Sequence, residues 1–275
     1  MADILDQTLV VGGSGRVGRL LARAWAQAGH SPTLQYRGTP LDWSGRQIAW
    51  QPLTEPLPPA RYAAMIVLAG AVRGDLSLNV QLAEACLRAA GQAGIGKILL
   101  ASSSAVYGAS NGQPCREETP LAPVNDYGRA KIAAEAVAEH WRARGLAVTC
   151  LRIGNVAGAD ALLTNPARPL LLDHFGNGAT PLRSYIGAQT MARVLADLLV
   201  QDLPPVLNLA APDPVAMGDL AAASGLPWQY QPAPATAYPR ITLDCSALAA
   251  RVAFTATDST AAEMIAQWRA SKGPQ

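Results

Sequence analysis

The sequence predicts an α/β fold in which helices cover both faces of a doubly wound parallel sheet. Two observations indicate this fold. Apolar runs of strand length alternate with segments of helix length, which is typical of βαβ units. In addition, 50% of the residues are hydrophobic, which supplies a sizeable core. A length of 275 residues is enough for one such domain with a small appendage.

The predicted elements follow one another in the order that a parallel sheet requires. Strands are expected over residues 8–11, 33–36, 65–69, 97–101, 146–152 and 207–210. Helices are expected over residues 17–28, 78–93, 127–144 and 260–270. The segment 38–59 is rich in proline and tryptophan and gives no clear prediction.

Composition argues against several classes of function. No run of Lys or Arg forms a basic stripe, so no nucleic-acid partner is expected. No apolar stretch reaches the roughly 20 residues that span a membrane, and the first residues do not resemble a signal peptide. The four cysteines lie far apart, which makes a disulfide framework or a metal site improbable and fits a reducing compartment. We therefore expect a cytoplasmic protein.

A glycine-rich turn follows the first strand and opens the first helix. Gly12, Gly15 and Gly18 let the backbone turn tightly and let a pyrophosphate approach the amide groups at the helix N-terminus. The first gap is one residue longer than in the common dinucleotide fingerprint. The turn predicts dinucleotide binding, and the alternative is a glycine-rich turn without a ligand.

Tyr127 and Lys131 are four residues apart and share one face of the predicted helix. A free tyrosine has a pKa of about 10 and is a poor base at neutral pH. A neighbouring ammonium group favours the phenolate, so the pair predicts general acid/base chemistry. An ordinary surface pair at helical spacing is the alternative.

Three serines, Ser102 to Ser104, follow the fourth predicted strand. Ligands of doubly wound sheets bind outside the carboxyl ends of the strands, where a hydroxyl can orient a reacting carbonyl. The alternative is a loop whose serines satisfy its own backbone groups.

Taken together, these motifs resemble the extended short-chain dehydrogenase/reductase family, of the NAD-dependent epimerase/dehydratase type. The resemblance runs from Thr8 to Gly158 and more weakly to Ala270. It rests on the glycine turn, on Leu68-Ala69-Gly70, Asn79-Val80, Ser102 to Gly108, Tyr127-x-x-x-Lys131 with Glu135, and Leu151 to Gly158. It implies a Rossmann-like dinucleotide-binding domain over residues 1–158. Residues 159–275 are expected to form a small substrate-binding region, with about 183–211 returning to the first domain.

The resemblance also implies roles for single residues. Ser103 corresponds to the catalytic hydroxyl, with Ser104 as the fallback, beside Tyr127 as acid/base and Lys131 as cofactor clamp. Substrate contacts are expected from Ser104, Asn155 and His174. The residues expected at the cofactor are Gly12, Ser14, Gly15, Arg16, Val17, Gly18, Arg37, Leu68, Ala69, Gly70, Tyr127, Lys131 and Ile153.

These roles predict an oxidoreductase or epimerase that acts on an alcohol or carbonyl substrate, such as a sugar or nucleotide sugar. Dehydration is less expected, because Ser104 and Ala105 stand where family dehydratases carry two acids. The family's Phe/Tyr-Ile-x-Val-x-Asp segment lacks its acid in the counterpart after Arg183, and only a short stretch separates Gly158 from Arg183, which indicates a reduced substrate cap. A non-catalytic cofactor-binding sensor or assembly protein is the alternative, and a homodimer is expected by analogy.

The end of the second strand bears on the cofactor. NAD-binding sites place an acid there, whereas this chain has Tyr36 followed by Arg37. Arg37 could pair with a 2′-phosphate, and Arg16 could add a second positive charge. The sequence therefore favours NADP, with NAD as the alternative.

Overall fold

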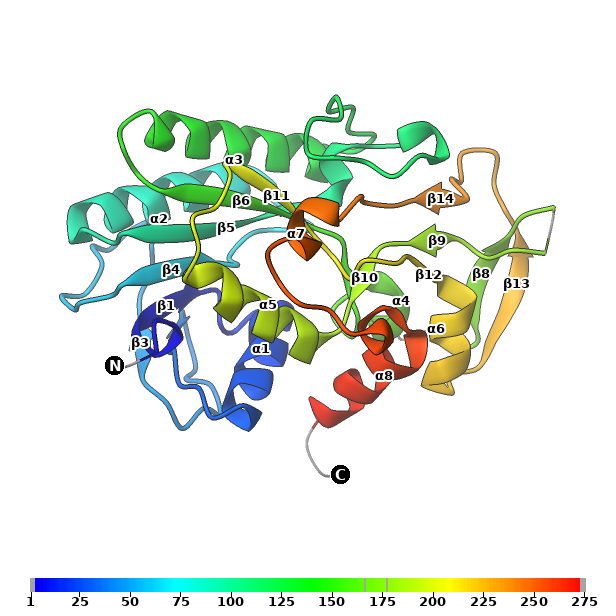
Figure 1. The fold of residues 1–275 in the computed structure, drawn as a ribbon, viewed down its shortest axis with the longest axis horizontal. Coiled ribbons are helices and arrows are strands. Elements are labelled where there is room, and N and C mark those ends of the chain that lie inside the picture. The colour runs from blue at the N-terminus through cyan, green and yellow to red at the C-terminus, as the bar shows by residue number, and fades with distance from the viewer. Residues whose placement is uncertain (1–2, 166, 177, 273–275) are drawn as a thin grey trace.

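The computed structural model describes residues 3–165, 167–176 and 178–272, and it confirms the predicted doubly wound sheet (Figure 1). Seven parallel strands lie in the order β11-β6-β5-β4-β1-β2-β3. They are β1 (Thr8–Val11), β2 (Thr33–Tyr36), β3 (Gln47–Ala49), β4 (Ala64–Val67), β5 (Lys97–Ser103), β6 (Val148–Ile153) and β11 (Val206–Leu209).

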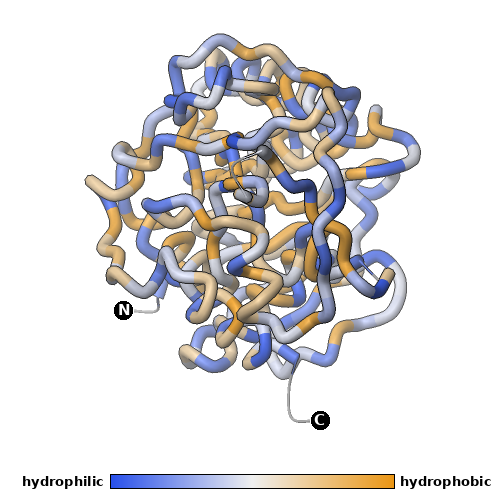
Figure 2. The backbone as a smooth tube through the Cα atoms, turned by 90° about the vertical axis from the view of Figure 1, so that its right-hand side faces the viewer, coloured by the Kyte–Doolittle hydropathy of each residue, from blue (hydrophilic) through white to orange (hydrophobic). Residues whose placement is uncertain are grey.

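Helices cover both faces of this sheet. The helices α2 (Leu78–Ala93) and α3 (Asp126–Arg142) pack together on one face, and α1 (Arg16–Gln27) and α5 (Ala188–Leu199) pack together on the other. Strands buried on both faces are expected to be continuously apolar, and every residue of β1 and β4 is buried. Hydrophobic stretches accordingly pass through the interior of the molecule (Figure 2).

The strand β3 lies in the segment that gave no sequence prediction. It is only three residues long and half-buried, and it pairs with β2 at the edge of the sheet. Such a short strand carries no readable alternation of apolar and polar residues. Trp50, directly after it, is fully buried, which explains part of the tryptophan content of this segment.

The second half of the chain adds small sheets and short helices beside the carboxyl ends of the main strands (Figure 1). Its strands are β7 (Asn155–Val156), β8 (Leu170–His174), β9 (Leu182–Arg183), β10 (Tyr185–Ile186), β12 (Val215–Ala216), β13 (Trp228–Pro232) and β14 (Arg240–Ile241). They form the groups β10-β7, β12-β9-β14 and β13-β8.

The remaining helices are short. They are the α-helices α4 (Ala161–Thr164), α6 (Met217–Ser224), α7 (Ser246–Ala249) and α8 (Ala261–Ala270). The 3₁₀ helices are η1 (Leu5–Gln7), η2 (Ser104–Val106), η3 (Ser110–Gly112) and η4 (Ala256–Ser259). The helix α5 and the strand β11 fall within the stretch expected to return to the main domain. The division into domains at residue 158 stays a prediction.

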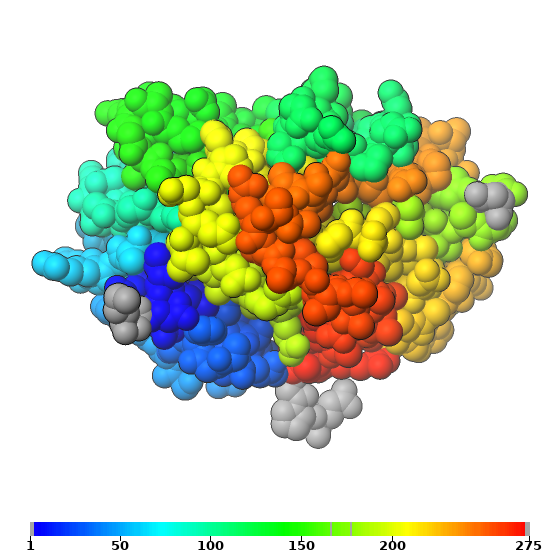
Figure 3. All heavy atoms as spheres, in the orientation of Figure 1, coloured from blue at the N-terminus to red at the C-terminus, as the bar shows by residue number. Residues whose placement is uncertain are grey.

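The terminal helix α8 lies next to α1, so segments from the two halves of the chain are in contact (Figure 3). Arg23 donates a hydrogen bond to the carbonyl of Ser271, and Gln27 donates one to the carbonyl of Ala270 at 3.2 Å. The terminal helix is therefore part of the main fold.

Candidate active site

A cleft of about 840 Å³ lies at the carboxyl ends of β1, β4, β5 and β6, bordered by α4. It brings together predicted residues that are up to 143 positions apart in the sequence. The predicted residues that line it are Gly12, Gly15, Arg16, Val17, Gly18, Leu68, Gly70, Ser103, Tyr127, Lys131, Ile153 and Asn155. Ser14, Arg37, Ala69, Ser104 and His174, all described, are not among the lining residues.

Close backbone approach explains the glycines of the turn. Gly12 has a φ of +87°, and a Cβ there would lie 2.7 Å from the backbone nitrogen of Ala69, in the loop after β4. A Cβ on Gly18 would lie 2.4 Å from the carbonyl oxygen of Gly12. Only glycine lets α1 and the loop after β4 approach the turn this closely.

The N-terminus of α1 faces the cleft with free amide groups. Gly15 caps this helix, and no described side chain accepts a hydrogen bond at the cap. The N–H groups of the first helical turn have no intrahelical acceptor and carry partial positive charge. They suit a pyrophosphate.

Lys131 enters the cleft from α3 and is 6% exposed. Its Nζ donates a hydrogen bond to the carbonyl of Ala101 at 2.9 Å and lies 5.9 Å from the centre of the Tyr127 ring. Burial lowers the pKa of Lys131 to about 8, against the opposing effects of Cys150 and Glu135. The Lys131 ammonium group therefore loses its proton much closer to neutral pH than an exposed lysine does.

The pKa of Tyr127 departs from the sequence-based expectation. The Tyr–Lys spacing predicts a lowered pKa, but in the free protein burial raises it, while a hydrogen bond with Ser103 opposes that rise. The reason is that the phenol is desolvated while Lys131 directs its nitrogen to Ala101. Tyr127 is thus a proton donor in the free protein.

The three serines differ in their surroundings. Ser103 caps η2 by accepting a hydrogen bond from the amide of Ala105 at 3.2 Å, so it does satisfy local backbone. It also lines the cleft beside Tyr127, where its hydroxyl can face a substrate oxygen. Ser102 is buried and donates to Glu135, and Ser104 begins η2.

Asn79 is a cleft residue to which the sequence gave no role. It is 3% exposed, and its amide nitrogen donates to the carbonyls of Ala71 and Leu76. Its Oδ1 has no hydrogen-bond partner among the described residues. A Cβ on Gly70 would lie 2.6 Å from this oxygen and 3.2 Å from the Lys131 nitrogen. The signal that could have found Asn79 was its place in the Asn79-Val80 motif.

Asp160 is a second cleft residue that the sequence analysis did not single out. It is buried, caps α4, and accepts a hydrogen bond from the Tyr185 hydroxyl at 3.0 Å. Burial raises the pKa of this carboxyl, and its hydrogen bonds counteract the rise. Asn155 also lines the cleft, and its side-chain amide nitrogen donates to the carbonyl oxygen of Ser184 at 3.5 Å.

The predicted cations and His174 occupy different places. Arg16 reaches across to donate to Thr164 at 3.2 Å. Arg37 is exposed just beyond the end of β2. His174 ends β8, and its ring lies 4.8 Å from that of Tyr230, which lines a separate hollow of about 660 Å³.

The cleft fits a dinucleotide. The glycine-rich turn and the free amides of α1 suit the pyrophosphate. The unpartnered oxygen of Asn79 beside Lys131 suits a ribose hydroxyl. Among residues 3–165, 167–176 and 178–272, no cluster of three His, Cys, Asp or Glu side chains could hold a metal ion. Within the same ranges, no helix combines the length and apolarity needed to cross a membrane.

Comparison with known proteins agrees with this geometry. Residues 69–184 match the model of the NAD dependent epimerase/dehydratase family. The chain is 41% identical over 100 residues to the UDP-glucose 4-epimerase of Azospirillum brasilense, covering 36% of this chain and 28% of that protein. The match thus spans about a quarter of the length of this curated relative.

Solved structures share the fold over nearly the whole chain. TunA, an NAD dependent NDP-hexosamine 5,6-dehydratase involved in tunicamycin biosynthesis, has a TM-score of 0.76 at 20% identity, over 98% of both chains. UDP-glucose 4-epimerase from Bifidobacterium longum, in complex with NAD+ and UDP, has a TM-score of 0.75 at 17% identity, over 97% of this chain and 98% of that one. At such identities the likeness establishes the fold.

The strand order, the glycine turn and the Tyr127–Lys131 helix agree with the resemblance found in the sequence, and residues 69–184 of this chain match the NAD-dependent epimerase/dehydratase family.

Proposed function

We propose that this protein is an NAD-dependent enzyme that acts by hydride transfer at a hydroxyl-bearing carbon of a sugar nucleotide, with epimerisation as its reaction. One observation carries the proposal: Ser103, Tyr127 and Lys131 line the same cleft as the glycine-rich turn after β1. The sugar-nucleotide substrate is supported by the UDP-glucose 4-epimerase relative and by the end-to-end match to structures of that class.

Each residue has a task that follows from its position. Bound nicotinamide supplies the acceptor or donor of hydride. Ser103 orients the reacting oxygen, and Tyr127, protonated in the free protein, gives a proton to a carbonyl or takes one from a hydroxyl. Lys131 holds ribose hydroxyls together with Asn79, and its charge favours the phenolate once water is displaced from the cleft.

Epimerisation is placed ahead of dehydration because Ser104 and Ala105 offer no carboxyl group to remove water. Simple reduction has no support from the comparisons. NAD is placed ahead of NADP because the neighbours with bound cofactor hold NAD, and because Arg37 is exposed outside the lining of the cleft.

The test is incubation of the purified protein with NAD or NADP and a panel of UDP- and dTDP-hexoses, with products identified by NMR. We expect interconversion of 4-epimers with NAD, and no turnover by Tyr127→Phe, which should bind NAD as the wild type does. A keto-deoxy product would indicate a dehydratase. Cofactor binding without any turnover would favour the sensor or assembly alternative, and tighter NADP binding lost in Arg37→Ala would restore the sequence-based cofactor prediction.

A further inference from the structure

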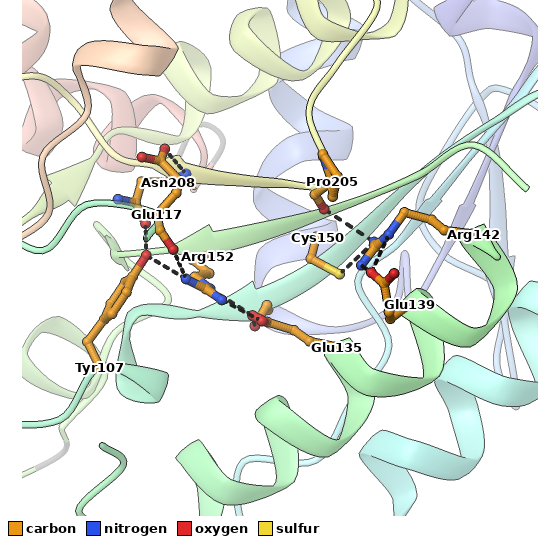
Figure 4. Close-up of polar contacts among 10 residues, drawn as sticks. Tyr107, Glu117, Glu135, Glu139, Arg142, Cys150, Arg152, Pro205 and Asn208 are labelled. Carbon is orange, nitrogen blue, oxygen red and sulfur yellow. Dashed lines mark hydrogen bonds and ion pairs between the residues drawn. The ribbon is translucent and has the colours of Figure 1, made fainter. Parts of the chain in front are cut away.

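A buried ion pair lies one helical turn beyond Lys131. Arg152 on β6 donates to both carboxylate oxygens of Glu135 on α3, from Nε at 3.0 Å and from a terminal nitrogen at 2.8 Å (Figure 4). The side chains of Arg152 and Glu135 are only 6% and 9% exposed. Neither lines the cleft.

This pair belongs to a double attachment of α3 to β5. Lys131 and Glu135 are four residues apart, so they project from the same face of the helix. Lys131 binds the carbonyl of Ala101, and Glu135 accepts a hydrogen bond from the hydroxyl of the next residue, Ser102. Ser103, the proposed substrate-orienting hydroxyl, follows directly. A shift of Glu135 would therefore move the helix relative to the strand end that carries Ser103.

Arg152 is itself held from the other side. Its remaining terminal nitrogen donates to the Tyr107 hydroxyl at 2.9 Å and to the carbonyl of Glu117 at 2.8 Å. Tyr107 in turn donates to Asn208 on β11 at 2.8 Å (Figure 4). The guanidinium group has no freedom to follow a displaced carboxylate, so its geometry fixes that of Glu135.

Stability alone does not account for such a pair. The desolvation of two buried charges offsets their attraction, and well-packed apolar side chains often serve a fold equally well. What a bidentate Arg–carboxylate pair adds is a fixed geometry.

We propose that the Glu135–Arg152 pair is a positioning element of the active site, which fixes the place of the Lys131 ammonium relative to the Ser103 hydroxyl. The effect of the pair on catalysis rests on the proposed function. The structural half of the inference, that the pair fixes the surroundings of the Lys131 ammonium, does not depend on turnover.

Three single variants test it. Glu135→Gln removes the charge at nearly constant shape, and Arg152→Lys keeps the charge but cannot make two parallel bonds. The matched control is Glu139→Gln, one turn further along α3, because Glu139 pairs with Arg142 at 2.6 Å but is 71% exposed (Figure 4). We expect kcat to fall about tenfold to a hundredfold in the first two variants, with KM little changed, and to stay at the wild-type value in the control.

A second readout does not need turnover. The chain has three lysines, Lys97, Lys131 and Lys272, so ε-¹³C-lysine labelling gives three signals that Lys131→Met assigns. We expect the Lys131 titration midpoint to fall by about half a pH unit or more in Glu135→Gln. It should also move in Arg152→Lys, where the net charge is unchanged, because Glu135 is then displaced. Glu139→Gln should leave it in place.

The double variant Glu135→Leu with Arg152→Met distinguishes a loss of positioning from a loss of folding, because it removes both charges together. We expect it to fold, by circular dichroism, and to have the same reduced kcat. A folded double variant with wild-type kcat would overturn the proposal. An Arg152→Lys protein with wild-type kcat and Lys131 titration would overturn it too. Absence of turnover in the wild type would refute the proposed function, while the NMR titration would still decide the structural half.

Discussion

At Lys131 the stability of the fold and the chemistry of the cleft have opposite requirements. The folded-state pKa of about 8 lies below the ordinary value of 10.5 because the ammonium group is buried. The cost of burying this charge is therefore fully present below pH 8, diminishes between pH 8 and 10.5, and is absent above that range. We predict that Lys131→Met is more stable than the wild type by about 1 to 2 kcal/mol at pH 7, after allowing for the lost bond to Ala101.

Urea unfolding of both proteins at pH 7 and above pH 10 measures this difference, which should disappear at the higher pH. The variant should have no measurable turnover. A Lys131→Met protein that is less stable than the wild type at pH 7 would mean that the contacts of the ammonium group outweigh its burial.

Gly18 offers a second prediction at the scale of one residue. An added Cβ would lie 2.4 Å from the carbonyl oxygen of Gly12, so Gly18→Ala must push α1 away from the turn. We expect the dissociation constant for NAD to rise at least about tenfold and the Tm to fall. Gly38→Ala, where a Cβ would meet no atom within 4 Å, is the control and should match the wild type in NAD titration and thermal unfolding.

The sequence was informative about single residues where chemistry depends on short spacing. The spacing of Tyr127 and Lys131 on one helix was enough to predict that they share the cleft, and the turn glycines could be assigned in the same way. Burial and distant partners could not be predicted. The raised pKa of Tyr127, the unpartnered oxygen of Asn79 and the pairing of Glu135 with Arg152 all depend on segments that meet only after folding.

Among the elements, α3 carries two of the three proposed catalytic groups, and its start is fixed by one side chain. Asn125 accepts a hydrogen bond from the amide of Gly128 at 2.8 Å as the N-cap. We predict that Asn125→Ala lowers the free energy of unfolding by about 1 kcal/mol and lowers kcat as well, because Tyr127 lies in the first turn. Asn125→Ser should restore both.

The matched control is Thr260→Ala, which removes the N-cap of α8. It should cost a similar free energy in chemical denaturation and leave kcat unchanged. Equal losses of kcat in the two variants would show that the effect comes from general instability.

Elements were predictable in proportion to their length and burial. The expected strands over 8–11 and 33–36 and the helix over 78–93 coincide with β1, β2 and α2. The two-residue strands of the second half were out of reach, because their pairing comes from tertiary contacts between loops and leaves no periodic pattern.

At the scale of the whole molecule, a side chain of the terminal helix caps the N-terminus of a helix that is distant in the sequence. The N-cap of α5 is Gly187, which has no side chain, and the Oε1 of Gln267 on α8 accepts hydrogen bonds from the amides of Gln189 and Thr190 at 3.0 and 3.1 Å. Gln267 is 5% exposed. We predict that Gln267→Ala lowers the free energy of unfolding by about 2 kcal/mol, because it strands two donors at a buried helix end.

Calorimetry of Gln267→Ala beside the exposed Gln229→Ala measures this effect, and only the first should lose stability. A Gln267→Glu protein keeps the accepting oxygen and should retain part of the lost free energy. If Gln267→Ala unfolds at the wild-type temperature, as Gln229→Ala should, α8 does not supply this cap in solution.

The main sheet is finished by a strand from the second half of the chain, and this limits how the protein can be recombined. Any exchange of everything after Gly158 for the corresponding part of another protein also replaces β11. The incoming strand must then present an amide side chain where Asn208 accepts from Tyr107, and a backbone N–H where that of residue 208 donates to Glu117. Viable chimeras therefore need a donor protein whose last sheet strand supplies both of these groups. Otherwise they need two separate grafts, one before α5 and one after β11, which leave these two elements in place.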